Sequence, residues 1–197
     1  MLDCFAFTYV EICFSALDAF ASPHLTGLGL SLEMIGLCYA LLAAVYVVGS
    51  LVCGQVISPR NLSKTMKIAL VFLSISIAMT GPPYSIPALL PIVISAMALT
   101  GAGCGPLVIP AFPHLLSAVE GAGLAVDDTL KDSLGSLSQA ALSVGEILGY
   151  WAVGGGVQWI GYGNTVTVVG AVGLIYLAVF AGLYRERKKG IMEYRLE

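Results

Sequence analysis

The chain has 197 residues, of which 58% are hydrophobic and 11% charged, and its mean hydropathy is +0.91. A soluble domain of this length uses far more charge, so the composition excludes a soluble fold. The formal net charge of −3 says little about partners, because the basic residues are confined to a few segments.

Six apolar stretches follow one another and predict six transmembrane helices, since about 20 helical residues cross the ~30 Å hydrocarbon layer. Strands are not expected, because an open strand leaves backbone groups unpaired in lipid and no alternating barrel pattern is present. The sequence therefore predicts an all-α membrane protein with a single six-helix domain over residues 1–197. The predicted spans are 4–21, 34–57, 66–80, 86–112, 136–158 and 164–184.

The positions of Lys and Arg predict the orientation of this bundle. Loops 22–33, 81–85 and 160–163 have no Lys or Arg, and because basic loops stay in the cytoplasm, both termini are predicted to be cytoplasmic. Loop 113–135 falls on the same side, since its acidic residues count little in this rule. Eight of the nine basic residues follow the second span (Arg60, Lys64, Lys67) or the sixth, in a tail over 185–197 (Arg185, Arg187, Lys188, Lys189, Arg195), and the ninth, Lys131, lies in loop 113–135.

The first span is expected to be a true span. No positive charge precedes it, and it carries Glu11 and Asp18, which is atypical of a cleaved signal peptide. The five cysteines lie in apolar runs without a CxxC pair and are expected to be packing residues. His24 and His114 lie at span ends and are expected to be interfacial; no metal site or cofactor is predicted.

Small residues and prolines predict how the helices pack and bend. Small residues every four positions allow close approach of two helices. Prolines in the fourth span remove backbone donors and predict a bend, which suits either a substrate path or a fixed kink. The packing positions are Gly36, Ala40 and Ala44 in the second span and Ala141, Gly145 and Gly149 in the fifth; the bend positions are Pro106, Pro110 and Pro113.

Carboxylates within the spans are the candidate functional groups. Glu11 and Asp18 are seven residues apart, so they share one helix face at about 10 Å separation, and Glu146 lies in the fifth span. An ionised carboxylate in hydrocarbon is costly, and no Lys or Arg lies in the interior of a predicted span. These groups therefore hold a proton, or take a counter-ion from a substrate or a partner helix. Alternatively, Asp18 reaches the outer interface.

Segment 101–116, GAGCGPLVIPAFPHLL, and segment 136–149, SLSQAALSVGEILG, followed by Gly154 and Gly155, resemble the tenth and eleventh helices of the vesicular amine and polyamine transporter family. The resemblance covers nearly the whole chain as the C-terminal six-helix half of a major facilitator superfamily transporter. Within that superfamily, the chain resembles in particular the vesicular amine transporters and their polyamine branch. Segment 15–18, SALD, resembles the seventh helix, which implies that Asp18 binds the cation or proton.

Four positions depart from the family pattern. Gly105 and Gln139 stand where the monoamine transporters have acidic residues, which leaves a cation or polyamine as the implied substrate. Tyr150 replaces a proline of the eleventh-helix signature. Segment 54–60, GQVISPR, resembles a degenerate cytoplasmic gating loop from Gly54 to Arg60, with Ser58 in place of its aspartate.

The resemblance implies one half of a proton-coupled antiporter for an organic cation, with Asp18 as the binding residue and Glu11, Glu146 and Gln139 beside it. Such a half needs a homodimer or a partner six-helix half, because alternating access moves one bundle against another. The alternative is a truncated, non-transporting subunit that modulates a full-length transporter. No enzyme, ATP-binding loop or nucleic-acid partner is expected. The chain is expected to be a multi-pass integral membrane protein of a vesicle, an endomembrane or the plasma membrane.

Overall fold

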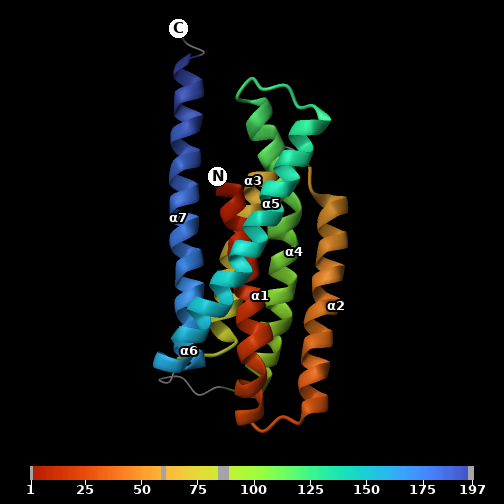
Figure 1. Cartoon of the computed structure of the whole chain (residues 1–197), viewed down its shortest axis with the longest axis vertical. Helices are drawn as coiled ribbons and strands as arrows, with labels where there is room; N and C mark the ends of the chain where they lie inside the picture. The colour runs from red at the N-terminus through yellow and green to blue at the C-terminus, as the bar shows by residue number, and fades with distance from the viewer. Residues whose placement is uncertain (1, 59–60, 84–88, 195–197) are drawn as a thin grey trace.

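The computed structural model describes residues 2–58, 61–83 and 89–194, and this part of the chain is helical without a strand. Six helical stretches are long and apolar enough to cross a membrane, which confirms the six predicted spans. A π-helix, η2, continues α5 into α6, so these three elements form the fifth span (Figure 1). The elements are α1 Leu2–Gly27, α2 Leu32–Val56, α3 Leu62–Met79, α4 Leu90–Glu120, α5 Asp128–Leu148, η2 Gly149–Val153, α6 Gly154–Ile160 and α7 Tyr162–Tyr194.

Several helices extend beyond the predicted spans. Helix α4 continues to Glu120, α5 begins at Asp128, and α7 continues to Tyr194. Hydropathy falls where a helix leaves the hydrocarbon, but the backbone hydrogen bonds that define the helix continue in water. Helix α5 also has a start signal, because the Asp127 carboxylate accepts a hydrogen bond from the Leu130 N–H at 2.8 Å.

Helix α4 lies between α2 and α3 and contacts both along its glycine-rich stretch. A Cβ on Gly101 would meet the Leu42 carbonyl of α2, and one on Gly105 would lie 3.1 Å from the Ser50 Cα. On the other side, a Cβ on Gly103 would lie 3.2 Å from the Leu73 Cα of α3. The glycines therefore let three helices approach backbone to backbone.

Helix α7 packs on α3 near a buried hydroxyl of α1. The Tyr9 hydroxyl lies 3.2 Å from the Ser74 Oγ of α3 and donates to the Val169 carbonyl of α7 at 3.2 Å. Gly173 of α7 leaves the space that the Tyr9 hydroxyl and the Ser74 side chain occupy. This contact joins three spans in the core.

Helix α2 corrects one packing prediction. A Cβ on Gly36 would meet nothing within 4 Å, and Ala40 and Ala44 are exposed. Helix α2 instead packs on α4 through its other face, and it lies at the opposite side of the bundle from α7 (Figure 1). Gly36, Ala40 and Ala44 therefore do not form a packing face in the part of the chain described, whereas Gly49 of the same helix lies against Ala102 of α4.

Candidate functional site

The seam between α1 and α5 positions the acidic residues. The Thr8 hydroxyl donates to the Ala141 carbonyl at 3.0 Å, and the Ser15 hydroxyl donates to the Glu146 carbonyl at 3.4 Å. Residue numbers rise together along the seam, so the two helices run parallel. The predicted face of Ala141, Gly145 and Gly149 is thereby confirmed as a packing face, because added Cβ atoms on both glycines would collide with α1.

The carboxylates of the two helices lie on the same side of this seam. A Cβ on Gly145 would lie 2.9 Å from the Glu11 Cβ, so Glu146, the next residue, stands at the level of Glu11. Glu11 interacts electrostatically with both Glu146 and Asp18. Glu11 is half-buried, whereas Asp18 and Glu146 are exposed on the surface of this chain. The three predicted acidic residues therefore form one acidic face within the first and fifth helical stretches that are long and apolar enough to cross a membrane.

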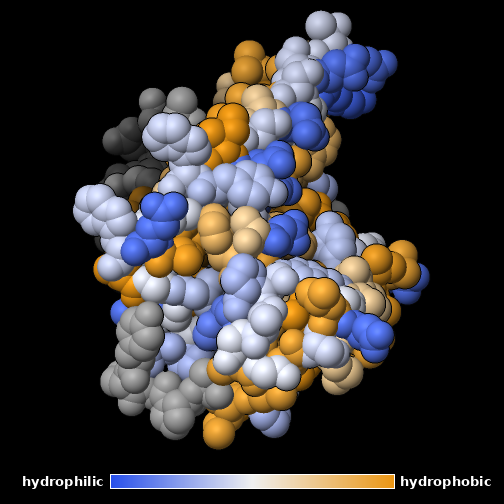
Figure 2. Space-filling view, turned by 60° about the horizontal axis from the view of Figure 1, so that its bottom comes forward, coloured by the Kyte–Doolittle hydropathy of each residue, from blue (hydrophilic) through white to orange (hydrophobic). Residues whose placement is uncertain are grey.

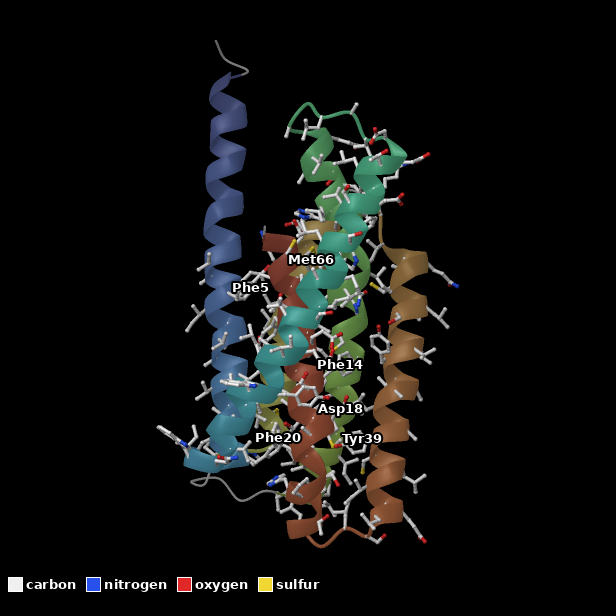
Figure 3. The ribbon with its side chains drawn as sticks, viewed as in Figure 1. Phe5, Phe14, Asp18, Phe20, Tyr39 and Met66 are labelled. Carbon is white, nitrogen blue, oxygen red and sulfur yellow. The ribbon has the colours of Figure 1, made fainter. Side chains whose placement is uncertain are left out.

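Aromatic side chains border the Asp18 end of the acidic face. The Tyr39 hydroxyl of α2 donates to the Leu17 carbonyl of α1 at 2.7 Å, and Tyr39 interacts electrostatically with Asp18. The Phe14 and Tyr46 rings meet edge to face, with centroids 5.7 Å apart. Figure 3 shows Phe14, Asp18 and Tyr39 together where α1 and α2 adjoin.

This arrangement suits a cation. Each of the two ion pairs within the described residues lies elsewhere, so Glu11, Asp18 and Glu146 have no basic side chain to neutralise them there. A carboxylate beside aromatic rings attracts an ammonium group through charge and through the ring faces. The described residues contain no group of three or more His, Cys, Asp or Glu side chains that could hold a metal ion.

Gln139 and Glu146 are seven residues apart on α5, so they lie on one helix face at about 10 Å. Gln139 is exposed, as Glu146 is. Gly54 lies near the end of α2 with nothing within 4 Å of an added Cβ, and Arg60 lies outside the described residues. The gating-loop hypothesis thus stays a prediction.

The prolines of α4 lie within one unbroken helix from Leu90 to Glu120. Each lacks an N–H, so the carbonyls of Ala102, Pro106 and Ile109 lose their usual donors four residues on. The predicted bend stays a prediction. Helix α4 therefore has fewer backbone hydrogen bonds near its predicted cytoplasmic end.

A cavity of about 310 Å³ opens between α1, the continuous α5–η2–α6 segment and α7, and includes none of the predicted site residues. Its walls are apolar except for Tyr9 and Thr165, and both hydroxyls are hydrogen-bonded. The end of the molecule that carries the α1–α2 turn mixes polar and apolar side chains without a single polar patch (Figure 2). Neither feature competes with the acidic face as a cation site.

Two features of the structure were not predicted from the sequence. The π-helix η2 lies in the fifth span next to the acidic face, and its Gly149 would contact the Ile12 Cα at 3.1 Å if it carried a Cβ. Asp3 and His114 meet at 2.6 Å although 111 residues separate them. Tyr150 falls within η2 and stands where the eleventh-helix signature of the resembled family has a proline. This departure from the signature is the one sequence feature that marks the position of the irregular turn.

Comparison with protein-family models finds no match, and comparison with curated proteins finds no matching relative.

Proposed function

We propose that this chain is one six-helix half of a major facilitator type carrier that exchanges protons for an organic cation. The observation that carries the proposal is the acidic face: three carboxylates within helical stretches long and apolar enough to cross a membrane, two of them exposed, with no basic partner among the described residues. The family resemblance of segments 15–18, 101–116 and 136–149 supports the same function.

The exposure of Asp18 and Glu146 argues for a second body opposite them. An ionised Asp at the centre of a lipid-facing helix costs about 3 kcal/mol or more, so such residues face a water-filled path or protein. A second copy of the chain, or a partner half, would enclose the face and create the path. Substrate sites of transporters lie between two such halves near the bilayer midplane.

The surroundings of the acidic face favour an elongated cation such as a polyamine over a monoamine. Asp18 and the Glu11–Glu146 pair are about two helical turns apart, roughly 10 Å, which suits a molecule with two or more separated ammonium groups. Position 105, acidic in the monoamine pattern, has no room for a side chain because an added Cβ would lie 3.1 Å from the Ser50 Cα. Gln139 offers an amide rather than a charge.

The test is reconstitution of the purified chain in liposomes with an imposed pH gradient, after its oligomeric state is fixed by native electrophoresis in mild detergent. We expect a dimer that accumulates labelled polyamine only when the gradient is present and moves protons in exchange, measured with an internal pH dye. A dimer that moves neither polyamine, amine nor proton would contradict the proposal. Co-assembly only with a larger transporter, whose activity it changes, would support the modulating subunit instead.

A further inference from the structure

A shielded ion pair joins α1 to α4 at the end that the basic loops predict to be cytoplasmic. The His114 Nδ1 lies 2.6 Å from the Asp3 Oδ1, and the two side chains are 18% and 6% exposed. The carboxylate accepts the hydrogen bond from the ring N–H. A short, charge-assisted contact that is shielded from water is stronger than a surface ion pair.

The part of α4 that carries His114 depends on contacts outside the helix. His114 directly follows Pro113, and the three prolines from 106 to 113 remove three donors from two consecutive turns. Fewer backbone hydrogen bonds therefore hold this part of α4 than hold a helix of the same length without proline. The contact with Asp3 therefore helps to hold this end of α4 against α1.

The seam behind the pair is closed and contains cysteines. Cys13 of α1 and Cys104 of α4 are both completely buried, and they lie close enough to interact electrostatically. On the α7 side, Tyr176 interacts electrostatically with Asp3 and packs on Phe5, with ring centroids 4.5 Å apart. The pair thus lies at the entrance of a seam formed by α1, α4 and α7.

We propose that Asp3 and His114 form a lock that holds the proline-rich end of α4 against α1, and that releasing the lock opens the seam as far as Cys104. The lock is independent of the proposed transport function, because it rests on the packing of the chain itself. It provides a defined point at which α4 can separate from α1 while the rest of the bundle stays folded.

The test uses Cys104 as a native reporter. The chain in lipid nanodiscs is treated with a membrane-permeant maleimide, and the labelling rate of each cysteine is followed by peptide mass spectrometry. We expect His114→Ala and Asp3→Ala to raise the Cys104 rate by roughly tenfold or more, as loss of a charged hydrogen bond allows. The double variant should label no faster than either single variant, whereas Asp3→Asn, which keeps an acceptor, should lie between.

The matched control is Lys131→Gln, which removes the exposed Lys131–Asp128 pair of 2.9 Å within α5 and should leave Cys104 unchanged. Two measurements separate opening from unfolding. Circular dichroism reports loss of helix, and general unfolding would also raise the labelling rates of Cys38 and Cys53 of α2. Unchanged Cys104 labelling in folded His114→Ala and Asp3→Ala, or additive effects in the double variant, would overturn the lock.

Discussion

The Ser15 hydroxyl of α1 donates a hydrogen bond to the backbone carbonyl of Glu146 in α5, with 3.4 Å between the two oxygens. The helix that carries Glu11 and Asp18 is thereby bonded to the helix that carries Glu146, and Thr8 repeats the contact two turns away at Ala141. The acidic face is therefore built on two hydrogen-bonded helices rather than on loops.

Gly145→Ala should destabilise the bundle, because the new methyl would lie 2.8 Å from the Thr8 Cα and force α1 and α5 apart. We expect a loss of about 1 to 3 kcal/mol in the free energy of unfolding, the usual cost of overpacking. The measurement is detergent-induced unfolding in micelles, followed by tryptophan fluorescence. Gly135→Ala in the same helix is the control; an added Cβ there meets nothing within 4 Å, so it should be neutral or stabilising. Equal losses in both variants would contradict the seam.

Tyr9→Phe should cost roughly 0.5 to 1.5 kcal/mol, because it removes the hydroxyl that bonds α3 and α7 while keeping the ring. The same unfolding assay measures it. Tyr150→Phe removes a hydroxyl from a residue that is 44% exposed and should change stability little. A larger effect at Tyr150 than at Tyr9 would mean that the Tyr9 contact does not join the three spans.

The predicted orientation can be checked by glycosylation in microsomes. An acceptor loop inserted in the α1–α2 turn, between Gly29 and Leu30, should be modified, because that turn has no basic residue and is predicted to face away from the cytoplasm. An acceptor beside Lys64, at the start of α3, should stay unmodified. Modification beside Lys64 alone would invert the orientation.

The sequence predicted the spans well but not all of their contacts. Hydropathy identifies six apolar stretches because lipid demands them, and these became the six spans. Spacing alone could not tell which small-residue face is used: Gly145 meets α1, whereas Gly36 meets nothing within 4 Å, although both occur in the same four-residue pattern. The difference lies in which helices become neighbours, and no single span encodes that.

The candidate site was predicted in part, for a similar reason. A seven-residue spacing places Glu11 and Asp18 on one face, and the structure adds Glu146 beside Glu11. Tyr39 and the Asp3–His114 pair were missed because each contact joins two different helices, and the pattern within one span does not show how two helices pack together. The π-helix was missed because one shifted hydrogen bond produces it, and hydropathy does not register such a change.

Glu146→Gln should reduce proton-coupled uptake less than Asp18→Asn. Glu146 shares its level with Glu11, so one carboxylate remains there after the substitution, whereas Asp18 alone supplies the charge beside Tyr39. Uptake by each variant at equal expression measures the difference. A greater loss at Glu146 would place the cation at the Glu11 level instead.

Binding of the transported cation by the acidic face can be measured with Asp18→Asn in the reconstituted, transport-competent assembly. The substitution keeps size and hydrogen bonding but removes the titratable charge. Asp132→Asn, an exposed residue in the first turns of α5 outside the predicted span, is the matched control. We expect Asp18→Asn to insert and fold normally but to lose pH-gradient-driven cation uptake, while Asp132→Asn retains it. Uptake with unchanged pH dependence in Asp18→Asn would show that the acidic face does not bind the transported cation.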